Sequence, residues 1–138
     1  MEVVNQVVPT MERAMAFFGS AEDGPFVMVN LLKFKPVAEY EDGSDAHLTG
    51  AEAYARYGEG VAKLVTALGG KIRYSSKVTD LMIGDVEELW DAVALAEYPS
   101  LAAFRQMAMS PEMHAIEHHR KAGLAGQLNI KTKPAEGF

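Results

Sequence analysis

Hydrophobic and polar positions form a different pattern from Phe26 to Phe34 than elsewhere in the chain. Up to Leu32, both alternating sets of positions are apolar, and Asn30 is the single polar interruption. A strand with one wet face alternates, whereas a strand buried on both faces does not. We therefore predict a central strand, covered by helices on one face and by a second layer on the other, which a second copy of the chain could supply.

Three more segments have strand patterns. Residues 72–78 alternate, which predicts a strand near a sheet edge, running on through the apolar residues 81–83 to a turn. Residues 90–98 are predicted to be a second central strand, with Glu97 on the face opposite to that of its alanines. A last strand is expected at residues 127–132.

Apolar residues recur at helical spacing in the other segments. Thr10 can cap a helix over residues 11–18, in which Met11, Met15 and Phe18 share a stripe, so residues 1–24 should form an N-terminal helical arm. Thr49 and Glu52 have the spacing of a capping box and predict a long helix that ends at Gly69-Gly70. Serine caps predict two shorter helices, which begin after Ser100 and Ser110 and end near Met109 and Leu124.

The order of these elements predicts an α+β ferredoxin-like sandwich, a single domain over residues 1–138 with a four-stranded sheet of the antiparallel type. We expect its two central strands, residues 26–34 and 90–98, to be adjacent and parallel. Residues 37–48 form an acidic loop, which is either a lid, a dimer contact or a mobile segment. Residues 133–138 are expected to be a polar tail.

The composition of the chain argues against several classes of protein, including disulfide-linked, membrane-spanning and nucleic-acid-binding ones. The absence of cysteine excludes disulfides and thiolate metal sites. The chain start lacks the pattern of a leader, and no apolar run approaches the roughly 20 residues that span a bilayer, so we expect a cytoplasmic protein without a membrane partner. A net charge of -6 with dispersed basic residues argues against nucleic-acid binding.

Several motifs together resemble the domain of unknown function 1330 family. They are Met-Val-Asn-Leu-Leu-Lys-Phe-Lys at residues 28–35, Tyr54 and Tyr57, Gly69-Gly70, Glu97-Tyr98-Pro99-Ser100, and Ser110-Pro111-Glu112-Met113 with Arg120. Met113 stands where the family commonly has an aromatic residue. The resemblance implies the dimeric α/β barrel superfamily, in which two sheets meet face to face, and hence a homodimer. Relatives in that superfamily include cofactor-free monooxygenases, muconolactone isomerases, haem-dependent peroxidases and ligand-sensing domains, so the fold does not decide the function.

Polar residues on apolar elements are the candidates for a site. Arg120 lies on the apolar stripe of its helix, where it can hold a substrate carboxylate, pair with Glu97 or Glu117, or extend its guanidinium along the helix to water. Asn30 and Glu97 interrupt the two central strands. They either share a pocket, with Asn30 as a hydrogen-bond donor and Glu97 as a catalytic base, or satisfy structural partners.

Aromatic and histidine side chains complete the list. Five aromatic residues either line a ligand cavity or belong to an amphipathic core, namely Tyr54, Tyr57, Tyr74, Trp90 and Tyr98. His114 and His118 are four residues apart on one helix, followed by His119, but most of this cluster is expected on a solvated face. We therefore assign no metal ligand and no cofactor.

Three functional hypotheses remain at this point. The first is a homodimer with a small-molecule pocket between helix and sheet, which performs cofactor-independent proton transfer or oxygenation on a small organic acid, with Glu97 as base and Arg120 as anion clamp. The second is a non-catalytic ligand-binding or structural dimer. The third is a haem- or metal-dependent enzyme, for which the histidines offer a thin basis.

Overall fold

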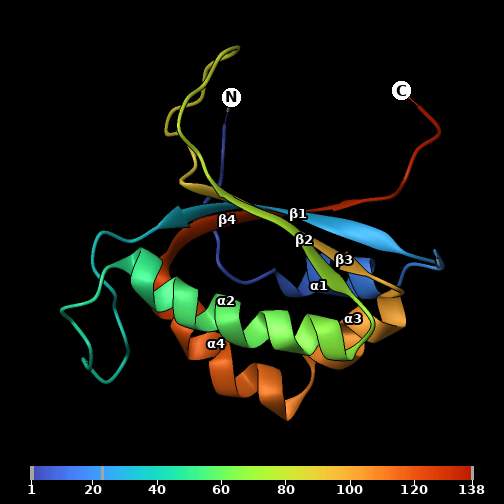
Figure 1. The fold of residues 1–138 in the computed structure, drawn as a ribbon, viewed down its shortest axis with the longest axis horizontal. Coiled ribbons are helices and arrows are strands. Elements are labelled where there is room, and N and C mark those ends of the chain that lie inside the picture. The colour runs from blue at the N-terminus through green and yellow to red at the C-terminus, as the bar shows by residue number, and fades with distance from the viewer. Residues whose placement is uncertain (1, 23, 138) are drawn as a thin grey trace.

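The computed structural model describes residues 2–22 and 24–137, in which helices pack on one face of a four-stranded sheet (Figure 1). Met1, Asp23 and Phe138, which the sequence places in the N-terminal arm and the tail, lie outside the described residues. The elements in chain order are α1 (Met11–Phe18), β1 (Phe26–Phe34), α2 (Gly50–Ala67), β2 (Lys71–Lys77), β3 (Ala92–Tyr98), α3 (Leu101–Ala108), α4 (Pro111–Gly123) and β4 (Leu124–Thr132). This is the ferredoxin-like arrangement that the sequence predicted.

The sheet has the strand order β2-β3-β1-β4, so β1 and β3 are its central strands, as predicted. Their predicted parallel pairing is wrong, because β3 runs antiparallel to β1, with Asn30 opposite Ala94. The α2 crossover makes β2 parallel in direction to β1, and the reversal between β2 and β3 then turns β3 the other way. All three neighbouring pairs of strands are therefore antiparallel.

Local capping signals fix where the helices begin. The Thr49 hydroxyl accepts a hydrogen bond from the Glu52 amide, and the Glu52 carboxylate accepts one from the Thr49 amide, so the predicted capping box is confirmed. Ser100 and Ser110 cap α3 and α4 in the same way through their hydroxyls. The helices enclose a core against the sheet that contains Phe26, Met28, Val65, Ala96, Tyr98, Leu101, Met107 and Met113.

Three predicted strand boundaries and one predicted helix face are wrong. Residues 81–83 do not extend β2; residues 78–91 are a loop, because the pairing of β2 with β3 ends at Lys77 and Ala92 and no strand lies beyond to accept hydrogen bonds. β3 accordingly starts two residues later than predicted, and β4 starts directly after α4 at Leu124. Of the predicted stripe on α1 only Phe18 packs, against Phe104, and it does so beside Phe17; Met11 and Met15 are exposed.

The face of the sheet away from the helices is uncovered and largely apolar. Val27, Val29 and Leu31 of β1 alternate with the core residues and are half-buried within the single chain. Val93 and Leu95 of β3 lie opposite Leu31 and Val29 on the same face. In the described part of the chain, no helix has the length and apolarity needed to cross a membrane.

Candidate functional site

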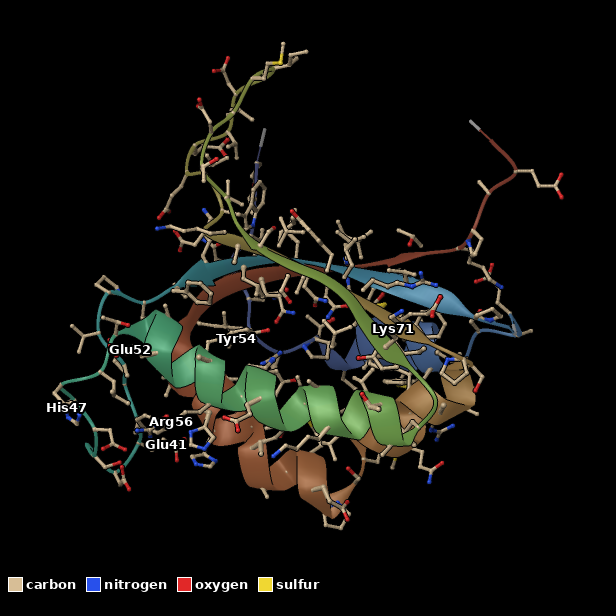
Figure 2. The ribbon with its side chains drawn as sticks, in the orientation of Figure 1. Glu41, His47, Glu52, Tyr54, Arg56 and Lys71 are labelled. Atoms are coloured by element: carbon tan, nitrogen blue, oxygen red, sulfur yellow. The ribbon has the colours of Figure 1, made fainter. Side chains whose placement is uncertain are left out.

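Five of the predicted site residues come from elements that meet between the sheet and the helices. Asn30 on β1 and Tyr98 on β3 lie on the helix-covered face, Tyr54 and Tyr57 project from α2, and Arg120 lies on α4. We call these five residues the inner cluster. In Figure 2, Tyr54 rises from α2 towards the sheet, where its ring lies 5.4 Å from that of Phe34.

The three tyrosines of the inner cluster form a buried group of phenols. The rings of Tyr54 and Tyr57 are 5.4 Å apart, and the Tyr57 hydroxyl lies 3.8 Å from the Met113 sulfur. Burial raises the pKa of Tyr54, Tyr57 and Tyr98 above the ordinary value for a phenol, while the positive charge of Arg120 opposes that rise for Tyr54 and Tyr57. These hydroxyls therefore stay protonated and can donate hydrogen bonds at neutral pH.

Arg120 is held by the N-terminal arm rather than by a carboxylate. Its Nη2 donates a hydrogen bond to the Val7 carbonyl oxygen, and neither Glu97 nor Glu117 pairs with it. The arm segment of residues 5–7 is itself attached to β4, because the backbone N–H of Gln127 donates a hydrogen bond to the backbone carbonyl of Gln6 at 3.0 Å. Arg120 therefore has a neutral backbone partner where the sequence suggested a negatively charged one.

Asn30 lies at the centre of an amide network that links β1 with β3 and β4. Its Nδ2 donates to the backbone carbonyls of Ala94 at 3.2 Å and Met28 at 3.4 Å. Its Oδ1 accepts hydrogen bonds from Gln127 Nε2 and Asn129 Nδ2, both at 2.8 Å. This arrangement agrees with the structural reading of Asn30, and it leaves a donor role towards a ligand as a prediction.

Gln127 and Asn129 are site residues that the sequence reasoning missed. They occupy alternate positions of β4 and point to the same face as Asn30, a signal that their spacing in the sequence already contained. Within the described part of the chain, Gln127 Oε1 is a buried oxygen without a hydrogen-bond partner. An unpaired buried acceptor costs about 1–3 kcal/mol, so a donor brought by a ligand would relieve a penalty that the protein carries alone.

Glu97 lies on the opposite face of the sheet from the inner cluster. It pairs with Val27 in the register, so its side chain alternates with that of Tyr98 and points away from the helices. Its carboxylate forms an ion pair with Arg73 Nη2 of β2 at 2.8 Å. The expectation that Glu97 and Asn30 point into one pocket is therefore wrong, as is the suggested pairing of Glu97 with Arg120.

Two of the predicted cavity aromatics also lie elsewhere. Tyr74 pairs with Leu95 in the register, on the uncovered face, and 58% of it is exposed. Trp90 precedes β3, and the Lys33 ammonium lies 5.6 Å from the centre of its ring. The tyrosines of α2 and Tyr98 thus come together, whereas Tyr74 and Trp90 do not join them.

The acidic loop of residues 37–48 is attached to the helices by a second polar group, which we call the loop cluster. Tyr40 of the loop hydrogen-bonds through its hydroxyl to His119 Nδ1 at 2.7 Å, and Asp45 forms an ion pair with Arg56 at 2.9 Å. His118 stacks beside His119 with ring centres 3.9 Å apart. Figure 2 shows Arg56 on α2 beside this loop.

The loop cluster contains two of the three histidines that the sequence offered as candidate metal ligands, His118 and His119. Loss of hydration lowers the pKa of His119, and the neighbouring charge of His118 adds to the effect. Among the residues that the structure describes, no group of three histidine or carboxylate side chains is placed to hold a metal ion. His114 is exposed and separate from the other two histidines.

Two open hollows lie outside the inner cluster. One is bounded by α3 and the turn after α1, and is lined by Phe18, Ser20, Ala21, Glu22, Leu101, Ala102, Arg105, Gln106 and Met109. The other lies at the base of the 78–91 loop, and is lined by Glu2, Val3, Asn5, Lys33, Glu87 and Glu88. Neither hollow is lined by a residue of the inner cluster, where the arm at Gln6 and Val7 contacts Gln127 and Arg120.

The comparison with protein families agrees with the motifs and with the fold. The family model of the domain of unknown function DUF1330 matches residues 44–132. The chain belongs to the DUF1330 family. The DUF1330 match includes α2, with both of its inner-cluster tyrosines, and extends through Arg120 to the end of β4.

Solved structures extend the similarity over the whole chain. The crystal structure of RPA0582, a protein of unknown function from Rhodopseudomonas palustris, shares 36% identity at a TM-score of 0.86, and the match covers 96% of this DUF1330 chain and 99% of that chain. A dimeric ferredoxin-like protein of unknown function from Bacteroides fragilis matches at 14% identity and a TM-score of 0.52, covering 80% of this chain and 97% of that one.

Similarity to more distant solved structures shows a shared fold and nothing further. A putative antibiotic biosynthesis monooxygenase from Caulobacter crescentus shares 14% identity at a TM-score of 0.51, over 83% of this chain and 92% of that chain. No curated protein matches this chain. The chemistry of this DUF1330 protein must therefore be argued from its own residues.

Proposed function

We propose that this chain forms a homodimer that binds a small organic anion in each subunit, between the sheet and helices α2 and α4. Arg120 binds the negative group of the ligand, the phenols of Tyr54 and Tyr57 donate hydrogen bonds, and the amides of Asn30 and Gln127 face the ligand from the sheet. The observation that carries this proposal is the arginine itself, because its guanidinium lies among buried phenols and has a carbonyl oxygen as its partner.

The Val7 carbonyl occupies a position that a ligand oxygen can take. A guanidinium binds a carboxylate through two parallel, charge-assisted hydrogen bonds, whereas a backbone carbonyl offers one neutral acceptor. A carboxylate ligand that displaces residues 5–7 therefore replaces a weaker partner of Arg120 with a stronger one. A carboxylate ligand that also carries a hydroxyl or amino group can donate a hydrogen bond to the unpaired oxygen of Gln127.

The geometry favours binding over the base-catalysed reaction considered from the sequence. Glu97, the proposed base, lies on the other face of the sheet in an ion pair with Arg73, so it is not available to a ligand beside Arg120. The tyrosines have raised pKa values and act as donors rather than bases. Non-catalytic ligand binding is therefore the function that these side chains support best.

The uncovered face of the sheet supports the homodimer. It exposes a continuous apolar surface made of alternate residues of β1 and β3, and two sheets pack through such surfaces about 10 Å apart. The ferredoxin-like protein from Bacteroides fragilis is described as dimeric, as is one from Thermobifida fusca with 13% identity and a TM-score of 0.51. A second copy is the partner that matches this surface in shape and hydrophobicity.

Calorimetric titration with benzoate and hexanoate tests the proposed site. We expect the wild-type chain to bind at least one of these carboxylates, and Arg120→Gln to weaken that binding about tenfold or more, because a charge-assisted bond contributes roughly 1.5–3 kcal/mol. Arg73→Gln is the matched control, since it removes an arginine that pairs on the opposite face. Its affinity for the carboxylate should equal that of the wild type.

Two results would contradict the proposed site. The first is a wild-type chain that binds neither carboxylate. The second is equal binding by Arg120→Gln and Arg73→Gln. Circular dichroism of each variant establishes that it is folded, so that a loss of binding is assigned to the missing guanidinium and not to a loss of structure.

A further inference from the structure

The loop of residues 78–91 has an apolar tip that is largely exposed to solvent. Met82 is 95% exposed and Ile83 is 83% exposed, and the preceding Leu81 is 44% exposed. Single exposed apolar side chains are common on protein surfaces, but three in succession at the end of a projecting loop form a concentrated patch. We call residues 81–83 the loop tip.

Hydrogen bonds and an ion pair attach the base of this loop to β1. The Asp91 amide donates to the Leu32 carbonyl at 2.8 Å, and the Asp91 carboxylate accepts a hydrogen bond from the Phe34 amide at 2.8 Å. The Val78 amide donates to the Asp91 carbonyl, which closes the base. Lys33 adds an ion pair to Glu88 at 3.4 Å. The direction in which the loop leaves the sheet is therefore determined by β1.

The loop rises on the side of the sheet opposite to the helices, above the uncovered apolar face (Figure 1). An extended chain advances about 3.3 Å per residue, so Met82 can stand about 16 Å beyond Lys77. Two sheets packed face to face are only about 10 Å apart. A loop of this length on one subunit is long enough to pass the plane of the sheet of a second subunit that covers this face.

We propose that the loop tip packs against the second copy of the chain and holds the two sheets together from the side. A two-fold axis makes the contact reciprocal, so each subunit holds its partner with one loop. The occupant follows from position, because the loop projects on the same side of the sheet as the apolar face that the proposed homodimer buries (Figure 1). This inference rests on the homodimer proposed above and adds a second contact surface to it.

The dissociation constant of the dimer, measured by sedimentation over a dilution series, tests the role of the loop tip. We expect the double variant Met82→Asp with Ile83→Asp to raise this constant at least tenfold. The control is Met11→Asp with Met15→Asp, which changes two exposed methionines of α1 on the helical side. Its dissociation constant should stay within twofold of the wild-type value.

Cross-linking gives a second readout that does not depend on weakening the dimer. The chain has no cysteine, so Met82→Cys places a single label site in the loop tip. We label it with benzophenone maleimide and expect illumination to produce a covalent dimer on a denaturing gel. The same label on Met11→Cys should produce none.

The outcomes separate the two proposals. A wild-type chain that is monomeric at micromolar concentration overturns the homodimer and the role of the loop tip with it. A dimeric wild type whose dissociation constant is unchanged by the loop-tip variant, and whose label at residue 82 forms no covalent dimer, overturns the role of the loop tip alone. Binding of the labelled loop tip to phosphatidylcholine vesicles, with the dimer unaffected, would likewise overturn it in favour of a lipid surface.

Discussion

At the scale of single residues, the polar side chains between the sheet and the helices are mostly paired with backbone or with one another. Asn30 uses both its oxygen and its nitrogen in hydrogen bonds. Arg120 donates a hydrogen bond to one carbonyl of the arm. The site is therefore part of what stabilises the fold, and substitutions there have consequences for stability as well as for binding.

Replacing Asn30 with leucine should lower the free energy of unfolding by about 2 kcal/mol. The leucine has the branching of asparagine but no polar atoms, so it leaves the partly buried Gln127 side-chain amide without its acceptor, and an unpaired buried donor costs about 1–3 kcal/mol. Urea denaturation measures the change. Asn129→Leu is the control and should cost less than about 1 kcal/mol, because Asn129 is exposed and Asn30 keeps its bond from Gln127. Equal costs for the two variants would contradict a central role for Asn30.

His119 should titrate below its ordinary pKa of 6.5 in the folded protein, which proton NMR of the imidazole measures. Loss of hydration is the main cause. In the tautomer that carries its proton on Nε2, Nδ1 of the neutral ring accepts from the Tyr40 hydroxyl, and for this tautomer Tyr40→Phe should move the pKa upward towards 6.5. A titration midpoint that Tyr40→Phe leaves unchanged would show that the hydrogen bond to Tyr40 contributes nothing to the shift.

The lowered pKa of His119 also determines the sign of a pH effect on stability. The unfolded chain binds the proton more readily than the folded one, so the contribution of neutral His119 is fully present above about pH 6.5 and is lost as the pH falls through the folded pKa. The fall in stability between pH 7 and pH 5 should therefore be smaller for His119→Gln than for the wild type, as measured by urea midpoints. An identical fall would contradict this linkage.

At the scale of elements, a close backbone approach joins the start of α2 to the end of α4. A Cβ on Gly50 would lie 2.2 Å from the Lys35 carbonyl oxygen and 2.7 Å from that of Gly123. A Cβ on Gly123 would lie 2.4 Å from the Gly50 carbonyl oxygen. The glycines let the backbones touch, and the contact places Tyr54, one turn into α2, beside the end of α4.

Gly50→Ala should therefore lower the free energy of unfolding by about 3 kcal/mol, because the new methyl group meets backbone atoms that cannot move aside. Gly58→Ala in the same helix is the matched control, since its Cβ would meet nothing within 4 Å. We expect the control to stabilise the protein by about 0.5–1 kcal/mol through the higher helix propensity of alanine. Thermal denaturation followed by circular dichroism compares the two, and a neutral Gly50→Ala would refute the close packing.

The success of the sequence predictions depended on how far apart the interacting residues lie. The capping box at Thr49 was predictable because its hydrogen bonds join residues three positions apart. The partner of Arg120 was not, because Val7 is 113 residues away and the contact depends on where the arm passes. The face occupied by Glu97 required the register between β1 and β3, which no local pattern specifies.

At the scale of the whole molecule, the role of the uncovered sheet face in the proposed homodimer can be tested without any ligand. Val29→Asp should raise the dissociation constant of the proposed homodimer by about 100-fold or more, because assembly would bury an unpaired carboxylate. Light scattering over a concentration series measures this dissociation constant. Val37→Asp, at a half-exposed position of the 37–48 loop, is the control and should leave the mass unchanged. A dimer that tolerates Val29→Asp must use another surface.

The position of β4 in the sheet affects what happens while the ribosome is still making the protein. β4 is the last strand in the chain, yet it pairs with β1, the first strand. Until residue 132 has emerged, β1 presents an open edge and is apolar on both faces, which are the properties of an aggregation-prone segment. A nascent chain stalled before β4 is thus the species most in need of a chaperone, and Phe26–Phe34 is the segment that a chaperone would bind.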